Sequence, residues 1–159
     1  SKKRETRKKS MKITTDTNTL ISATFWTGNP YRILEMIDQE KVELILSEEI
    51  IEEYIDVANR DEIMEKVERK GLTTSKIVDK AINSATIVEP QEKVNVVTDD
   101  PDDNKIIEAA VAGNAQYIVT QDNHLLTLKK HNDIKIVTPE DMLNILRKEE
   151  STSTESQDI

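Results

Sequence analysis

Four acidic side chains, far apart in the chain, have the chemistry that a divalent-cation site requires. They are Asp16, Glu53, Asp103 and Asp122. Mg²⁺ and Mn²⁺ prefer oxygen ligands, usually a few carboxylates together with water. Clustered carboxylates repel one another unless a cation lies between them, so convergence of these four would itself predict a bound metal. A metal lowers the pKa of its bound water and stabilises charge on a phosphate under attack, which is hydrolytic chemistry.

Each acid also has a simpler explanation when it is considered alone. Asp16, like Asn18, is a residue type common in turns after a strand. Asp103 and Asp122 could each cap a helix. Glu53 could lie on a solvated helix face with neighbouring glutamates. The functional interpretation therefore depends on all four acids meeting at one place, which depends on the fold.

Strands and helices alternate along most of the chain. Apolar, β-branched runs predict strands at residues 11–16, 42–46, 86–88, 117–120 and 134–137. Helical spacing and capping residues predict helices at 31–38, from Ser47 onward, twice within 60–85, at 104–112, around 125–128 and at 139–147. This alternation predicts one α/β domain with a mostly parallel sheet of about five strands flanked by helices.

The fold class brings the acids to related positions. Asp16 ends the first predicted strand, and Asp122 lies just past the strand at 117–120. Asp103 begins the helix before that strand, and Glu53 lies one turn into the helix after 42–46. Ligands of parallel sheets bind beyond the carboxyl ends of the strands. We therefore expect the four acids to converge on that edge of the sheet.

Composition limits the classes that need to be considered. The chain has 159 residues, the size of one domain, and its few aromatic residues predict an aliphatic core. It has no cysteine, which excludes disulfides, thiolate zinc sites and a cysteine nucleophile. No apolar run approaches the roughly 20 residues that span a bilayer, and no signal peptide follows the basic start. We expect a cytoplasmic protein that does not contact membranes.

Charge is distributed unevenly. Residues 1–10 hold six Lys/Arg and one Glu, so subtracting their charge of +5 from the net charge of −9 leaves −14 on residues 11–159. An acidic body argues against binding phosphates through Lys and Arg, but it is compatible with metal-dependent nuclease chemistry. We predict a disordered basic extension at 1–10, a PIN-like domain at 11–149 and a disordered polar tail at 150–159.

Four motifs in the same order carry a resemblance to a known family. They are Thr15-Asp16-Thr17-Asn18, Ser47-Glu48-Glu49-Ile50-Ile51-Glu52-Glu53-Tyr54, Asp100-Pro101-Asp102-Asp103-Asn104-Lys105 and Tyr117-Ile118-Val119-Thr120-Gln121-Asp122. From residue 11 to about 147 the chain resembles the PIN-domain ribonucleases. The closest resemblance is to prokaryotic members that are toxin components of toxin–antitoxin pairs.

The resemblance implies an endoribonuclease that uses Mg²⁺ or Mn²⁺. By position, the four metal-binding and catalytic acids of the family fall on Asp16, Glu53, Asp103 and Asp122, and supporting polar residues fall on Asn18 and Thr120. The implied partners are an RNA substrate, a small antitoxin that inserts Arg or Lys among the carboxylates, and a second copy of the chain.

Two of the assigned acids have acidic neighbours. Glu53 fits the family spacing from Ser47 better than Glu52 does. Asp103 fits the register of the following helix better than Asp100 or Asp102. The remaining alternatives are a non-catalytic PIN-like module that binds RNA or protein, and an RNA processing or decay nuclease without an antitoxin.

Other chemistries fit less well. Phosphatases with an Asp-x-Asp-x-Thr motif need a second carboxylic acid to exchange a proton, whereas this chain has Asn18 at that position. A receiver domain needs an acidic pair before its phosphorylated Asp, and the first strand ends in one acid only. The chain's histidines, His124 and His131, are interpreted as exposed residues rather than as a general base or a zinc site.

Overall fold

The computed structural model describes the backbone of residues 10–157 and the side chains of residues 10–151. The predicted basic extension, apart from Ser10, and the last two residues of the predicted tail lie outside the described residues.

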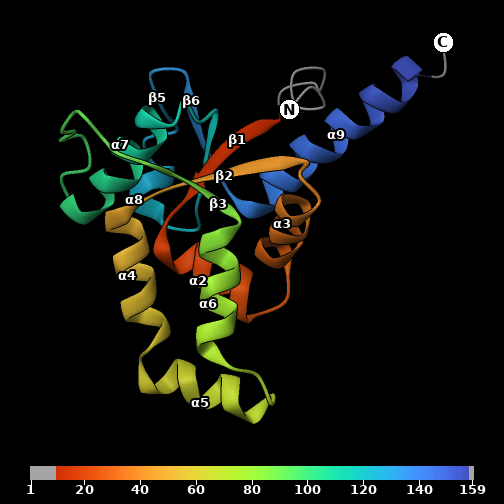
Figure 1. Cartoon of the computed structure of the whole chain (residues 1–159). Helices are drawn as coiled ribbons and strands as arrows, with labels where there is room; N and C mark the ends of the chain where they lie inside the picture. Colours follow the sequence, from red (N-terminus) through yellow and green to blue (C-terminus); the bar gives the residue numbers. More distant parts are fainter. Residues whose placement is uncertain (1–9, 158–159) are drawn as a thin grey trace.

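A six-stranded sheet forms the centre of the protein (Figure 1). Its strands are β1 (Met11–Thr15), β2 (Val42–Ser47), β3 (Ala85–Val88), β4 (Tyr117–Val119), β5 (Lys130–His131) and β6 (Ile134–Val137), in the order β3-β2-β1-β4-β6-β5. Neighbours are parallel except for β5 and β6. The prediction of a mostly parallel α/β fold is confirmed. The sixth strand is the two-residue β5, which is too short to show a period in the sequence.

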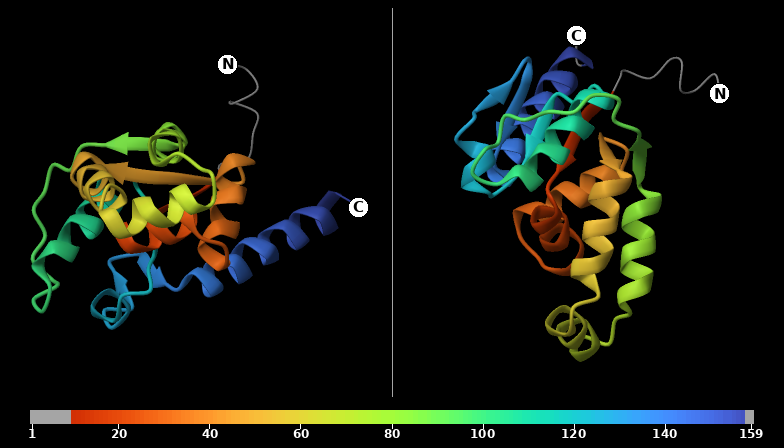
Figure 2. Two further views of the ribbon diagram at one scale, coloured as in Figure 1. Left: turned by 90° about the horizontal axis from the view of Figure 1, so that it is seen from below. Right: turned by 90° about the vertical axis from the view of Figure 1, so that its left-hand side faces the viewer.

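Helices flank this sheet (Figures 1 and 2). In chain order they are α2 (Thr17–Phe25), α3 (Asn29–Asp38), α4 (Glu48–Ala58), α5 (Asp61–Arg69), α6 (Thr74–Asn83), the 3₁₀ turn η1 (Pro101–Asp103), α7 (Asn104–Ala112), α8 (Asn123–Leu126) and α9 (Pro139–Gln157). Helices α4 and α6 extend away from the sheet, and α5 joins them at their far ends (Figure 1).

The sequence analysis did not predict α2. This helix begins with threonines, which are poor helix formers, and six of its nine residues are buried, so it lacks the one-sided apolar stripe of a surface helix. Its start is stabilised by Asp16, whose Oδ1 accepts a hydrogen bond from the backbone N–H of Thr19 at 3.1 Å. Tertiary burial, rather than local propensity, therefore determines this helix.

The last helix is longer than predicted. Helix α9 continues past residue 147, where the sequence predicted its end, and reaches Gln157. Lys and Glu at 148–150 are good helix formers, and neither Gly nor Pro follows to end the helix. Lys41 Nζ lies 2.6 Å from Glu150 Oε1, and the end of α9 projects from the body (Figures 1 and 2).

The core is aliphatic, as the composition predicts. The parallel strands β1, β2 and β4 contribute residues that are almost wholly buried, because helices shield the sheet from solvent. Helix α7 packs closely on β2: a Cβ added to Gly113 would lie 2.4 Å from Cγ2 of Ile45. Gly113 is the C-cap of α7, and the absence of a side chain there permits this close approach.

Candidate metal centre

Strands β1 and β4 are parallel neighbours, with Thr15 paired to Val119 at their carboxyl ends. The residues that follow the two strands therefore lie side by side. Asp16 is the N-cap of α2, and Asp122 is the N-cap of α8. Asp103 is the last residue of η1 and the N-cap of α7. The side chains of Asp16 and Asp122 do cap their helices, so the simple explanation applies to these two, whereas the Asp103 side chain makes no capping hydrogen bond.

Thr120 links two of these acids. This fully buried residue donates its hydroxyl to Asp16 Oδ2 at 2.9 Å, and the same Oγ1 accepts the backbone N–H of Asp122 at 3.0 Å. Asp16 is itself buried, with 6% of its surface exposed. Thr120 therefore fixes the orientation of the Asp16 carboxylate relative to the turn that carries Asp122, which is the supporting position that the resemblance implied for it.

A compact group of ligand atoms forms beside this link. One ligand atom each from Asp100, Asp103, Asp122 and His124 lies within 4.8 Å of the others. Among the described residues, Oδ2 of Asp103 is buried without a hydrogen-bond partner. The Asp122 backbone turn also places its Oδ1 2.9 Å from the backbone N of His124. The group combines hard oxygen donors, an imidazole and one carboxylate oxygen that lacks a partner.

The pKa shifts show that the carboxylates repel one another. Burial, together with smaller contributions from Asp122, Asp100 and Asp16, raises the pKa of Asp103 to about 7. Burial also raises the pKa of Asp16; hydrogen bonds from Thr19 and Thr120 offset part of this rise, while the charge of Asp122 adds to it. Negative charge at this edge is therefore unfavourable without a cation.

Two residues that the sequence does not assign to the site belong to this group. The register of the following helix favours Asp103 over Asp100; His124 is predicted to be exposed, and it is exposed while its ring also reaches the group. Asp100 and Asp103 are three residues apart, and the intervening 3₁₀ turn aligns residues at that spacing. His124 follows Asp122 by two positions in the short helix α8. Those spacings were visible in the sequence, but the 3₁₀ turn was not predicted.

Glu53 is in a different environment. Its Oε2 forms a hydrogen-bonded ion pair with Nζ of Lys105, a residue on α7 whose side chain is only 13% exposed. Partial burial raises the pKa of Glu53, but Lys105, with smaller contributions from Thr17 and Arg60, outweighs it and lowers the pKa. The charge of Glu53 is thus neutralised by Lys105. Glu53 is not one of the four residues whose ligand atoms lie within 4.8 Å of one another. The neighbouring Glu52 is exposed.

Asn18 makes no described side-chain contact that would support the site. It is exposed on the first turn of α2. In the part of the chain that the structure describes, its side chain forms no hydrogen bond, so a role in holding substrate stays a prediction.

Asn104 was quoted in a motif but given no role, and it holds the acidic loop in place. Its Oδ1 accepts the backbone N–H groups of Val96 and Val97 at 3.0 and 2.9 Å. Its Nδ2 donates to the carbonyls of Val97 and Pro101 at 3.1 and 3.0 Å. These four bonds tie the loop before η1 to the start of α7, which positions Asp100 and Asp103.

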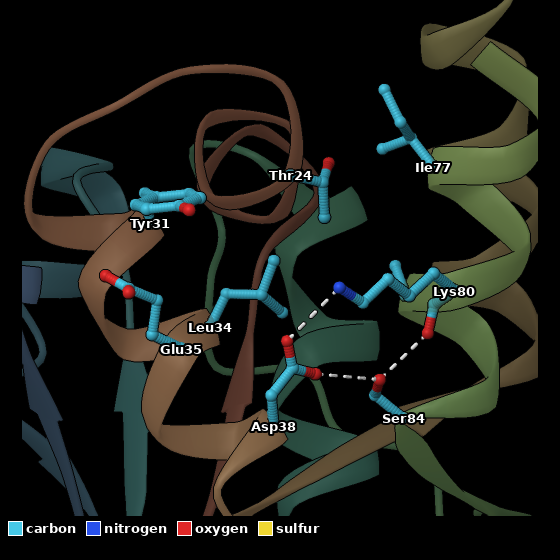
Figure 3. A pocket seen from close by; sticks show the side chains of 9 residues that line it. Thr24, Tyr31, Leu34, Glu35, Asp38, Ile77, Lys80 and Ser84 are labelled. Carbon is cyan, nitrogen blue, oxygen red and sulfur yellow. Dashed lines mark hydrogen bonds and ion pairs between the residues drawn. The ribbon is translucent and has the colours of Figure 1, made fainter. Parts of the chain in front are cut away.

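A pocket between α3 and α6 serves as a comparison, because the opposite charges in its lining are paired (Figure 3). Lys80 Nζ lies 3.5 Å from Asp38 Oδ2, and the Ser84 hydroxyl lies 3.4 Å from Asp38 Oδ1 and 2.8 Å from the carbonyl of Lys80. The acid and the base of this pocket compensate each other. The contrast distinguishes the Asp103 group, whose carboxylates have no Lys or Arg partner among the described residues; Asp122 Oδ1 lies 3.6 Å from Nδ1 of His124, a member of the same group.

The donor set of the Asp103 group fits a divalent metal. Hard cations such as Mg²⁺ and Mn²⁺ bind carboxylate oxygens, and imidazole nitrogen is a ligand for transition metals. Oδ2 of Asp103 has no hydrogen-bond partner, and burial together with neighbouring carboxylates raises the pKa of Asp103; a bound cation would explain both observations. Asp16, held by Thr120, lies close enough to Asp103 and Asp122 for their charges to affect one another.

Comparisons with known proteins agree with this fold. The sequence profile of the PIN domain matches residues 12–124, a range that contains all four predicted acids. The crystal structure of PAE2754 from Pyrobaculum aerophilum is similar at 18% identity, with a TM-score of 0.56, over 87% of this chain and 96% of that chain. VapBC2 from Rickettsia felis, solved with a DNA fragment from their promoter, is similar at 15% identity, with a TM-score of 0.55, over 80% and 98%.

No protein with a curated description matches the sequence. The described helices include none that is both long enough and apolar enough to cross a membrane.

Proposed function

This chain belongs to the PIN domain family, and from that premise we propose that it is a metal-dependent endoribonuclease. The observation that carries the proposal is the buried, partnerless Oδ2 of Asp103 within a group of carboxylates. Such a group destabilises the protein unless it binds a cation, and the cation that fits oxygen donors is Mg²⁺ or Mn²⁺.

Some residues of the site would bind the metal, and others would position them. Asp103, Asp122 and Asp16 would hold the metal, with Asp100 and His124 as further ligands. When bound, the metal would lower the pKa of a water molecule and stabilise negative charge on the phosphate.

The other residues would position these groups. Thr120 keeps Asp16 oriented through its hydroxyl hydrogen bond. Lys105 holds Glu53 as a carboxylate, and in the proposed reaction Glu53 orients the attacking water. Water adds to phosphorus, the phosphodiester P–O bond breaks, and the leaving ribose oxygen takes up a proton.

The test is cleavage of end-labelled RNA by the purified protein with Mg²⁺, with Mn²⁺ and with EDTA. Cleavage should require metal and fall by at least about a hundredfold in Asp16→Asn and Asp103→Asn, since even residues behind metal ligands contribute ten- to a hundredfold. Asp102→Asn is the matched control, because Asp102 is exposed beside Asp103.

Other results would change the proposal in defined ways. Cleavage that survives in both variants would rule out the assigned site. RNA binding without cleavage under any metal condition would favour a non-catalytic PIN-like module.

We further propose a small antitoxin as partner, with an Arg or Lys that enters the carboxylate group, and action in the cytoplasm. The fold similarity to VapBC2 supports a two-component system. An adjacent short reading frame for a DNA-binding protein, whose product blocks cleavage when it is co-expressed, is the expected finding. Its absence would favour an RNA processing or decay nuclease. Size-exclusion chromatography with light scattering tests the proposed homodimer.

A further inference from the structure

A second concave site lies at the far end of α2 from Asp16. This Trp26 pocket has a volume of about 260 Å³ and includes Trp26, Lys66, Arg69, Lys70 and Leu72 in its lining. Trp26 is the C-cap of α2, and the cations come from α5 and its C-cap. Leu72 is 51% exposed, so the pocket has an accessible apolar edge.

The pocket is positively charged, and its lining contains no acid that would neutralise the charge; Lys70 Nζ donates a hydrogen bond of 3.4 Å to the carbonyl oxygen of Phe25. Three cations line it, and no acid does. Nζ of Lys66 and of Lys70 lie 5.5 and 5.8 Å from the centroid of the Trp26 ring. In the described part of the chain, none of the three cations forms an ion pair with a carboxylate.

This concentration of cations contrasts with the rest of the body. Residues 11–159 hold 16 Lys/Arg against 30 Asp/Glu, the whole-chain counts of 22 and 31 less the six and one in residues 1–10. Over most of such a surface a phosphate backbone is repelled. A site lined by three unneutralised cations is a place where it is attracted.

The aromatic ring adds a second feature of nucleic-acid sites. Trp26 packs edge-on against Phe25, with ring centroids 6.0 Å apart and an interplanar angle of 78°. The ammonium groups of two flexible, exposed lysines lie over the Trp26 ring. A base could stack on the ring while the lysines turn to the adjoining phosphates, since aromatic rings and cations together bind single strands without sequence preference.

The pocket lies within reach of the proposed cleavage site. Asp16 and Trp26 are ten residues apart at the two ends of α2, which is about 15 Å at 1.5 Å per residue. Helix α4 runs beside α2, with the Tyr54 hydroxyl 2.9 Å from Oγ1 of Thr24. Arg60, which follows α4, is close enough to Glu53 to lower its pKa. Arg60 is the N-cap of α5, so one cation lies along the chain between Glu53 and the pocket residues Lys66 and Arg69.

We propose that the Trp26 pocket binds a single-stranded segment of the RNA outside the scissile bond. The proposal rests on the proposed ribonuclease function and deepens it by naming where substrate is held. Lys66, Lys70 and Arg69 contact phosphates, and Trp26 stacks on a base. An acidic peptide is the rival ligand, and the experiment distinguishes it.

Trp26 is the single tryptophan of the chain, so its fluorescence reports on this pocket directly. The full-length Asp103→Asn protein is titrated with a single-stranded RNA of about twelve nucleotides, within the range that single-strand sites cover. Parallel titrations use oligoglutamate. The test variant adds Lys66→Gln and Lys70→Gln. The matched control adds Lys130→Gln and Lys135→Gln, two exposed lysines that face each other across β5 and β6.

We expect RNA to quench Trp26 emission to saturation. The Lys66/Lys70 variant should bind RNA about tenfold more weakly. In a plot of log affinity against log salt concentration, its slope should be shallower by about 0.7 for each phosphate that the variant no longer neutralises. The Lys130/Lys135 variant should bind as the parent does, which also controls for RNA held by the basic residues 1–10. Thermal unfolding of each variant verifies that it is folded.

Three results would overturn the inference: RNA binding that leaves Trp26 emission unchanged, equal affinity in both lysine variants, or saturable quenching by oligoglutamate but not by RNA. The cleavage assay is read separately. If the wild-type protein cuts RNA but the pocket fails these tests, the ribonuclease function stands without the subsite. If RNA binds in the pocket but no metal supports cleavage, the subsite stands and the ribonuclease proposal fails.

Discussion

Helix α2 has Asp16 at its start and Trp26 at its end, and the charged groups around these two residues are arranged in opposite ways. Around Asp16, carboxylates from η1 and α8 gather, and no Lys or Arg in the described residues forms an ion pair with Asp16, Asp103 or Asp122. Around Trp26, cations gather without carboxylates.

Two ion pairs elsewhere in the described residues show the contrary arrangement. Asp38 and Lys80 compensate each other between α3 and α6, and Glu53 and Lys105 do so beside the acidic group. The two ends of α2 differ from these pairs, because each has an excess of one sign. A site with excess negative charge is prepared for a cation, and a site with excess positive charge is prepared for an anion. With a metal bound among the carboxylates, an RNA strand could place one phosphate at the metal and others at the cations around Trp26.

The largest expected effect comes from removing charge at the acidic end. Asp103→Asn should abolish Mn²⁺ binding in calorimetry and lower RNA cleavage by at least about a hundredfold. In EDTA the same variant should unfold at a higher temperature than the wild type, because it removes one of several repelling carboxylates. A lower melting temperature in EDTA would mean that Asp103 is a structural cap and would remove the contrast between the two ends.

Removal of the Thr120 hydroxyl, which links Asp16 to Asp122, should have a smaller effect on metal binding and cleavage. Thr120→Val keeps the side-chain shape but removes the hydroxyl that binds Asp16 Oδ2 and the backbone N–H of Asp122. We expect metal affinity and cleavage to fall by about ten- to a hundredfold, as for other residues that orient metal ligands. Thr120→Ser should restore most of both. No recovery in the serine variant would show that packing, rather than the hydroxyl, is what matters.

Removing cations from the Trp26 pocket should weaken RNA binding without slowing the cleavage step. In cleavage kinetics, Lys66→Gln with Lys70→Gln should raise KM for a long single-stranded RNA by about tenfold and leave kcat unchanged. A short RNA that covers only the acidic group should be cut equally well by the variant and the wild type. A fall in kcat on both substrates would place these lysines in the cleavage step and merge the two sites.

The smallest effect is the pH dependence of stability without metal. The folded-state pKa of Asp103 is about 7, above the value of about 4 for an unfolded chain. Its contribution to the free energy of unfolding is therefore full below about pH 4 and is lost as the pH rises toward 7. In EDTA, the melting temperature should fall between pH 5 and pH 8, and Mg²⁺ or Mn²⁺ should reverse the fall. Asp103→Asn should make the melting temperature in EDTA less dependent on pH. An unchanged pH dependence in this variant would contradict its attribution to Asp103.

Much of the fold follows from local patterns. The five predicted strands occur at nearly the predicted places, because buried parallel strands are continuous apolar runs. Helix α2 was missed because its burial on most sides leaves no periodic stripe. The extent of α9 was underestimated because a polar composition was interpreted as disorder, although Lys148, Glu149 and Glu150 favour helix.

The sequence by itself indicated that Asp16 and Asp122 lie at one edge of the sheet, since they follow the adjacent parallel strands β1 and β4. Residues that follow adjacent parallel strands, or that begin the helix packed on them, reach the same edge whatever the details of packing. The family match over residues 12–124 agrees with the resemblance that the motifs carry.

Only the tertiary structure decided which side chains are neutralised and which are not. Glu53 is paired with Lys105, 52 residues away, and Trp26 lies under lysines from a helix some forty residues further along the chain. Such contacts depend on how α4, α5 and α7 are placed against α2, and no local period or propensity encodes that placement. Charge compensation is a property of distances in space, so the two uncompensated ends of α2 appear only when the chain has folded.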